Sequence, residues 1–169
     1  MIKLKDEGMI SMFRKMRRFK QQLEESECIE LLKNEPRGVL SLIGDDGYPY
    51  GIPMDHFYCG ENGRLYFHCA KEGHKTDALT ACDKVSYCVM DKGYRKEGEW
   101  PLHIKSVIVF GRISTVNDSQ KTLEICRRLA AKFTDDADYI NDEIERCKDK
   151  VLCLELFPEH ITGKLVKES

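Results

Sequence analysis

The chain has 169 residues, with 27 Lys and Arg against 29 Asp and Glu, and a net charge of -2. Its 41% hydrophobic and 33% charged residues exclude the disordered and fibrous classes. A nearly neutral chain has no overall field to hold nucleic acid or an anionic membrane. No apolar stretch approaches the roughly 20 residues of a membrane helix, and residues 1–7 lack the apolar part of a secretory signal. We therefore expect a cytoplasmic protein with no nucleic-acid or membrane partner.

The chain has eight cysteines, but none of them are paired in a C-x-x-C spacing. A structural zinc site usually takes two thiolates from one turn at that spacing, so we expect no metal. Reduced thiols are the expected state in a cytoplasmic protein. Cys69, Cys88 and Cys153 fall in predicted strands, where we interpret them as small apolar fillers.

Residues 1–24 are predicted to form a basic N-terminal arm, in which residues 14–20 carry five positive charges. A nucleic-acid patch is one interpretation of this arm, and a solvated segment is the one we favour. Residues 25–169 are expected to form a single domain. Its first predicted element is a helix over residues 26–33, with Ser26 as the N-cap.

Short β-branched segments bounded by turn residues follow the helix. They predict strands over residues 38–43, 48–58, 65–69, 84–90 and 103–113. Asp45-Asp46-Gly47 is a strong hairpin-turn signal between the first two strands. Gly111 indicates a bulge or bend within the longest strand.

Apolar residues return to helical spacing after the longest strand. Asn117 or Asp118 is expected to cap this helix, and a second helix is predicted over residues 137–147. The chain then returns to strand over residues 151–157 and 161–166. Hairpins, a helical insert and closing strands predict a mainly β (α+β) fold, a small antiparallel β-barrel whose helices are peripheral.

The segment from Phe67 to Lys75 is the part of the chain best suited to bind an anion. Gly73 frees the backbone after a strand, and Lys75 stands at the start of a probable helix. Free N–H groups at a helix N-terminus, the helix dipole and an ammonium group together favour phosphate. His74 adds a second donor. A loop that binds nothing is the alternative.

Residues 50–56 are the second feature that could carry function. Gly51 removes a side chain and Pro53 removes a backbone donor, which leaves strand backbone open to a flat ring or to another chain. An edge strand protected from aggregation by its prolines is the alternative.

Four segments in this order resemble the pyridoxamine-phosphate-oxidase-like flavoproteins. They are residues 37–41, 46–53, 65–75 and 105–112. The most specific of them contains Tyr66-Phe67-His68-x-Ala70-x-x-Gly73-x-Lys75. More narrowly, the chain is similar to the nitroimidazole-resistance branch over residues 25–167.

This resemblance implies a split antiparallel β-barrel, a homodimer, and FMN bound in a groove at the dimer interface. It implies that the residues binding the cofactor are Pro53, Met54, Asp55, Phe67, His68, His74, Lys75 and Ser106. Among these, His74 and Lys75 match the phosphate segment, and His68 is the candidate acid–base catalyst. A plain flavin contact or a core histidine is the alternative for His68. His56 has a similar but weaker claim to proton transfer.

The activity implied is that of an FMN-dependent oxidoreductase, which passes electrons from NAD(P)H to a small acceptor such as a nitroimidazole. A flavin-binding sensor without turnover is one alternative, and a relative that binds haem or a deazaflavin in the same groove is another. Residues 159–169 contain no arginine, whereas the true oxidases hold pyridoxal phosphate with arginines there. Oxidation of pyridoxamine phosphate is therefore not expected.

Overall fold

The computed structural model describes residues 13–168, so residues 1–12 of the predicted arm lie outside the described part. Its strands are β1 (Arg37–Ile43), β2 (Pro49–Asp55), β3 (Phe57–Cys59), β4 (Arg64–Ala70), β5 (Lys84–Met90), β6 (Leu102–Thr115) and β7 (Val151–Glu168). Its helices are α1 (Glu25–Asn34), α2 (His74–Ala81), α3 (Ser119–Ala130) and α4 (Ala137–Cys147), with short 3-10 turns at Phe19–Gln21 and Asp45–Gly47.

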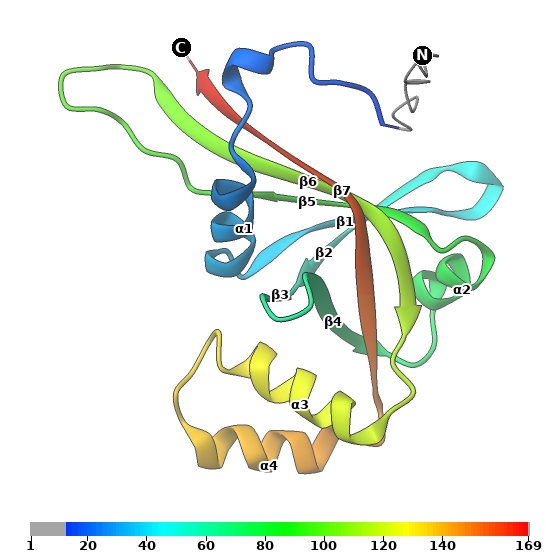
Figure 1. Cartoon of the computed structure of the whole chain (residues 1–169). Helices are drawn as coiled ribbons and strands as arrows, with labels where there is room; N and C mark the ends of the chain where they lie inside the picture. Colours follow the sequence, from blue (N-terminus) through cyan, green and yellow to red (C-terminus); the bar gives the residue numbers. More distant parts are fainter. Residues whose placement is uncertain (1–12, 169) are drawn as a thin grey trace, which may run out of the picture.

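The strands form one antiparallel sheet in the order β2-β1-β5-β6-β7-β4-β3, which curls into a half-open barrel (Figure 1). The two edge strands, β2 and β3, are consecutive in the chain but do not pair with each other. The predicted mainly β (α+β) split barrel with peripheral helices is therefore confirmed. Its core is filled by inward-facing side chains, the largest of which are Tyr87, Phe67, Leu40, Leu65, Leu154 and Leu156.

The predicted strand over residues 48–58 is wrong in one respect, because the chain breaks into two strands at His56. Strand β2 pairs with β1, whereas β3 pairs with β4 at the other edge of the sheet. At the break, the His56 backbone N–H donates to the Pro36 carbonyl at 3.0 Å. The chain therefore crosses the open side of the barrel at this residue.

The last two predicted strands form a single strand, β7, which continues through Pro158. Phe110 pairs with His160 and Gly111 with Pro158, which leaves Glu159 as the extra residue of a bulge. A proline is tolerated at a bulge because its missing N–H is not needed there. The predicted irregularity at Gly111 is confirmed, and a Cβ on this glycine would stand 2.1 Å from the Phe157 carbonyl oxygen.

Helices α1 and α3 each begin directly after the residue that caps them. Helix α1 begins at Glu25, so the predicted cap at Ser26 is wrong; Glu24 precedes the helix and its N–H donates to the Glu27 carboxylate at 3.2 Å. Asp118 caps α3 as predicted, and its Oδ1 accepts from the N–H groups of Gln120 and Lys121.

Helices α3 and α4 form a hairpin inserted between β6 and β7 and lie against one end of the barrel (Figure 1). Ile125 and Leu129 of α3 pack on Tyr66 and Cys153 of the sheet. Cys69 and Cys153 are buried as predicted, but Cys88 is exposed, which corrects its interpretation as a filler. None of the helices within residues 13–168 has the length and apolarity needed to span a membrane.

Candidate functional site

The predicted phosphate-binding segment folds as the sequence indicates. Strand β4 ends at Ala70, and α2 begins at His74, directly after Gly73. Gly73 has φ 131°, a conformation that favours glycine, and no heavy atom lies within 4 Å of the position a Cβ would take there. The first N–H groups of α2 have no partner within the helix, and the glycine before them adds no side chain.

Lys75 joins this segment to strand β2. Its Nζ lies 3.2 Å from the Met54 sulfur, so the side chain reaches from α2 back to the sheet. Within residues 13–168, eleven ion pairs and two histidine–carboxylate contacts join side chains, and none of them includes Lys75. The half-buried ammonium is thus a positive charge without an acidic partner in the described chain.

His74 is held by a different set of contacts. Its ring stacks on Tyr50 with a centroid separation of 4.2 Å, and its Nε2 lies 3.5 Å from Asp45 Oδ2. Tyr50 comes from β2 and Asp45 from the turn before it, so the β1–β2 hairpin and α2 are fixed together at this corner. The sequence analysis missed Tyr50, although period-two alternation along β2 places it on the same face as Met54.

The predicted ring-lining residues Pro53, Met54 and Asp55 lie side by side along β2. Pro53 is exposed, whereas Met54 is buried and its carbonyl oxygen lies 2.8 Å from the Tyr87 hydroxyl oxygen. The Asp55 carboxylate accepts two hydrogen bonds from the Arg37 guanidinium, at 2.6 and 3.1 Å. Arg37 thereby neutralises Asp55 at the end of this strand.

Phe67 and His68 are neighbours on β4 but lie on opposite faces of the sheet. Phe67 is fully buried in the barrel core, in edge-to-face contact with Tyr87. His68 points outward, and no hydrogen bond to its ring is present within residues 13–168. Desolvation lowers the pKa of His68, Asp55 acts to raise it, and the positive charge of Lys75 lowers it further. The imidazole is therefore neutral at pH 7.

His56 does not have the open site that proton transfer requires, which corrects the weaker catalytic role given to it. Its ring is fully buried, with Nε2 2.8 Å from the Leu32 carbonyl and Nδ1 2.9 Å from the Tyr87 hydroxyl. Burial lowers the pKa of His56 to about 4, and Lys132 contributes to the lowering. His56 is thus a neutral core histidine that ties α1 to the sheet.

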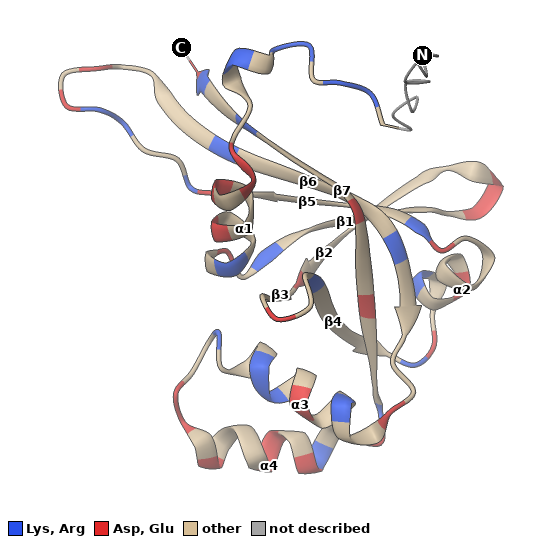
Figure 2. Cartoon of the chain, viewed as in Figure 1, with Lys and Arg blue, Asp and Glu red and all other residues tan. Residues whose placement is uncertain are grey.

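Ser106 is not brought next to the other predicted residues within one chain. It lies on β6, opposite Met90 of β5 and Lys164 of β7, and three strands from β2 in the sheet. Ser106 lies on the same face of β6 as Ile108 and Phe110, and this face belongs to an exposed apolar strip across β1, β5 and β6. Few charged residues occur in the middle of these strands (Figure 2). The exposed apolar residues of this strip are Val39, Ile43, Met90, Ile108 and Phe110.

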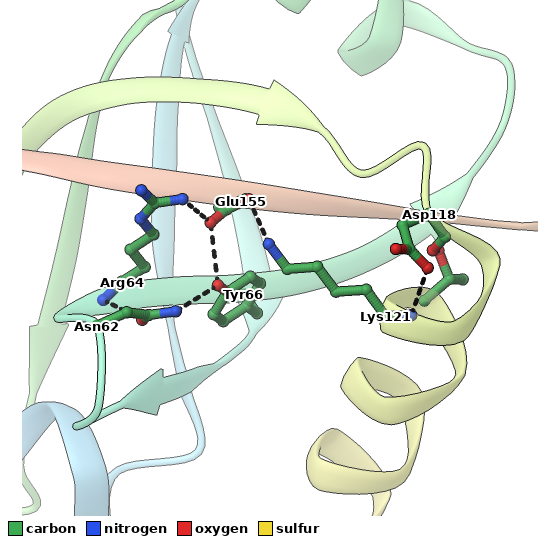
Figure 3. A network of polar contacts seen from close by, with 7 residues as sticks. Asn62, Arg64, Tyr66, Asp118, Lys121 and Glu155 are labelled. Carbon is green, nitrogen blue, oxygen red and sulfur yellow. Dashed lines mark hydrogen bonds and ion pairs between the residues drawn. The ribbon is translucent and has the colours of Figure 1, made fainter.

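A second polar cluster, which the sequence analysis missed, occupies the other end of β4 (Figure 3). The Glu155 carboxylate accepts hydrogen bonds from Arg64, from Lys121 at 2.9 Å and from the Tyr66 hydroxyl at 3.0 Å. Asn62 donates to the Tyr66 oxygen at 2.9 Å. Burial acts to raise the pKa of Glu155, but the hydrogen bonds from Lys121, Arg64 and Tyr66 outweigh it, and the pKa is lowered.

The family model of pyridoxamine 5'-phosphate oxidase matches residues 24–165, most of the chain. The chain belongs to this family. No curated protein sequence matches it.

Three solved structures illustrate the likeness of this family member to other proteins. A candidate 5-nitroimidazole antibiotic resistance protein of Bacteroides thetaiotaomicron shares 18% identity over 87% of each chain, with a TM-score of 0.72. An FAD-binding protein of Mycobacterium smegmatis shares 21% identity over 88% of this chain and 99% of that chain, with a TM-score of 0.62. An FAD- and haem-binding protein of the same organism shares 18% identity over 86% and 73%, with a TM-score of 0.68. At these identities the likeness shows the fold.

The family segment judged most specific in the sequence, residues 66–75, forms the end of β4 and the start of α2. The structure brings Lys75 to Met54 and His74 to Tyr50 of the same hairpin, so three of the predicted residues, Met54, His74 and Lys75, meet at one corner. Within residues 13–168, no cluster of three or more His, Cys, Asp and Glu side chains is placed to hold a metal ion.

Proposed function

We propose that this member of the pyridoxamine 5'-phosphate oxidase family binds FMN and passes electrons from NAD(P)H to a small acceptor. The observation that carries the proposal is Lys75, a cation without an acidic partner, placed at a helix start and resting on Met54 of β2. A phosphate at this point would meet the ammonium and the free N–H groups of α2 together.

The residues at this corner fit FMN in both its parts. The open space beside Gly73 leaves room for the phosphate, and the exposed residues Gly51 and Pro53 of the edge strand β2 are open to a ring. Bound there, FMN would supply electron storage and transfer, which no amino-acid side chain supplies. The chain itself would fix the phosphate with Lys75 and orient the ring along β2.

His68 is the residue that would handle a proton at this site. Its ring is neutral at pH 7, so one nitrogen donates a hydrogen bond and the other accepts one. A donor N–H beside the acceptor would stabilise negative charge as it develops there, and solvent can return the proton afterwards. Lys75 and strand β2 would thus bind the cofactor, and His68 would supply the proton.

We also propose that the protein acts as a homodimer. The apolar strip of the sheet is the supporting observation, since side chains such as Met90 (64% exposed) and Ile108 (38% exposed) lie open on it. A second copy packed on this strip would cover these side chains. We expect this second copy to contribute its Ser106 to the first chain's flavin site, because within one chain Ser106 lies three strands from β2.

The first experiment is the absorbance spectrum of freshly purified protein, followed by an NAD(P)H oxidation assay with a nitroimidazole as acceptor. Flavin bands and acceptor-dependent NAD(P)H consumption are expected. Flavin bands without consumption would favour a sensor, and a Soret band would favour a haem-binding relative. A colourless protein that takes up no added FMN would contradict the proposal.

The dimer has a separate test in solution. Wild-type protein is expected to elute with twice the mass of the chain by light scattering, whereas Ile108→Glu is expected to elute as a monomer. The substitution places a charge in the middle of the apolar strip, where a partner would have to bury it. Glu97→Lys, in the β5–β6 loop, is the matched control, and a monomeric wild type would contradict the proposal.

A further inference from the structure

A cavity of about 310 Å³ lies between the α3–α4 hairpin and the outer side of the sheet. Its walls come mostly from the hairpin, and they are largely apolar. The apolar lining residues are Leu123, Leu129, Ala130, Phe133, Ile140, Ile144 and Val151, with the thiols of Cys126 and Cys147. A half-open cavity of this size and polarity is typical of sites that bind small, largely apolar molecules.

The charged groups on the lining already have partners. Asp55 is held by Arg37, and Lys148 donates to Glu145 at 2.6 Å. Glu143 pairs with Arg146. A charged ligand would therefore find no free countercharge among the described lining residues, and burying its charge would be costly.

His68 differs from the other polar lining residues. Its ring has no hydrogen-bond partner in the described chain, so it can donate to or accept from a molecule in the cavity. Of the residues expected to bind FMN, only His68 and Asp55 line the cavity. The cavity thus meets the candidate flavin site at one boundary, and the residue without a partner lies on that boundary.

We propose that this cavity receives the electron acceptor, and that the acceptor is a neutral, flat molecule of one or two rings whose oxygen accepts a hydrogen bond from His68. Quinones and nitroarenes belong to this class. For a quinone, NAD(P)H gives up two electrons and one proton, solvent gives a second proton, and the quinone becomes a hydroquinone. The inference rests on the proposed function for its electron supply, but the binding itself does not depend on it.

The test measures binding rather than turnover. Duroquinone is the probe, because it is neutral and flat and has no free ring carbon for a thiol to attack. It is titrated calorimetrically into the oxidised full-length protein in the absence of NAD(P)H. Saturable binding is expected, whereas benzoate, a charged ring of similar size, is expected not to bind.

Two neighbouring alanines provide matched variants. Ala130 lines the cavity, so Ala130→Phe fills it and is expected to weaken duroquinone binding by about ten-fold or more. Ala131 is exposed and does not line the cavity, so Ala131→Phe is expected to leave the affinity within about two-fold. Equal affinities in the two variants would overturn the assignment of the site.

The cavity thiols give a second readout that does not depend on a folded variant. Duroquinone is expected to slow iodoacetamide labelling of Cys126 and Cys147 in the wild type, measured by peptide mass spectrometry. Cys82, at the end of α2 and outside the cavity lining, is the internal control and should label at the same rate throughout. Unchanged labelling of all three thiols at saturating duroquinone would overturn the inference.

The two proposals fail in different ways. FMN uptake without duroquinone binding would contradict this inference and leave the flavin proposal standing. Duroquinone binding without FMN uptake would contradict the flavin proposal and leave the assignment of the binding cavity standing. The hydrogen bond is tested with His68→Gln, which keeps an N–H donor and is expected to bind better than His68→Leu; equal binding would remove His68 from the inference.

Discussion

The two ends of strand β4 carry polar side chains on the same outer face of the sheet, but these side chains are used differently. At one end, Arg64, Tyr66 and Lys121 all converge on the Glu155 carboxylate. At the other end, His68 has no hydrogen-bond partner in the described chain, and the nearby Lys75 rests on a sulfur atom. One end is closed by its own contacts, whereas the other has unused capacity to bind.

A cluster of charged groups that stabilises the fold can be distinguished from one that binds a ligand by whether its hydrogen bonds are already made within the chain. A group whose hydrogen bonds are all made within the chain offers little to a ligand and contributes to the fold. A half-buried cation without a carboxylate costs stability unless something else binds it. The Glu155 cluster is thus predicted to matter for folding, and the Lys75 corner for binding.

The largest expected effect is the loss of stability when the Glu155 cluster is disrupted. Glu155→Ala leaves Arg64 and Lys121 without their carboxylate, and we expect the free energy of unfolding to fall by about 3 kcal/mol. Chemical denaturation measures the loss. Glu145→Ala, which removes an exposed carboxylate from α4, is the control and is expected to change stability little. Equal losses in the two variants would show that the Glu155 cluster is not special.

At the open end, Lys75→Ala is expected to weaken FMN binding by about 2 kcal/mol, or roughly thirty-fold in Kd, because it removes a charge-assisted contact to phosphate. Fluorescence quenching during an FMN titration measures the affinity. Lys71→Ala, an exposed charge on the same loop, is the control and should bind nearly as wild type. An unchanged Kd for Lys75→Ala would remove the phosphate site from this corner.

The buried His56 is expected to make the stability of the protein depend on pH. The pKa of His56 is lowered to about 4 from an ordinary value of 6.5. Between these two pH values, His56 is protonated in the unfolded chain but neutral in the folded chain. The stability is therefore fully present above pH 6.5 and is lost as the pH falls toward 4. Between about pH 7.5 and pH 5 the loss should be about 2 kcal/mol.

Denaturation curves at the two pH values test this expectation for His56. In His56→Gln most of the pH-dependent loss should disappear, although the variant is less stable at both values. In His68→Gln, which alters the outward-facing histidine, most of the loss should remain. The same pH dependence in His56→Gln and in the wild type would contradict the buried, neutral state of His56.

The smallest expected effect concerns the ion pair between Arg37 and Asp55. The Arg37 side chain is 63% exposed, so Arg37→Ala is expected to leave the melting temperature almost unchanged. The variant leaves the Asp55 carboxylate unneutralised beside the cavity and is expected to weaken duroquinone binding more than it affects stability. A large drop in melting temperature would show instead that Arg37 stabilises the fold, as is predicted for the Glu155 cluster.

Local signals in the sequence predicted most of the fold. The turn at Asp45–Gly47, the bulge at Gly111 and the cap at Asp118 are each set by neighbouring residues, and all three are present. The break at His56 and the passage of β7 through Pro158 were not predictable, because each depends on a strand distant in sequence. A proline is expected to end a strand unless the bulge beside it, here at Glu159, is known.

The candidate site divides in the same way. The segment ending at Lys75 was identified from its own residues, since a glycine before a helix start and a lysine in its first turn form a local pattern. The contact of Lys75 with Met54, the stacking of His74 on Tyr50 and the Glu155 cluster join residues far apart in the chain. Such contacts carry no local signal, and only the fold reveals them.

The position of the α3–α4 hairpin has a consequence for how such a protein can diversify. The hairpin leaves the sheet after Thr115 of β6 and returns at Val151 of β7. These two strands pair from Thr115 with Leu154 to Leu102 with Glu168, interrupted by the bulge at Glu159. The sheet therefore does not need the helices to hold its two longest strands together. The residues of the insert that face the cavity could therefore change without altering the pairing of β6 with β7 or the contact of Lys75 with Met54.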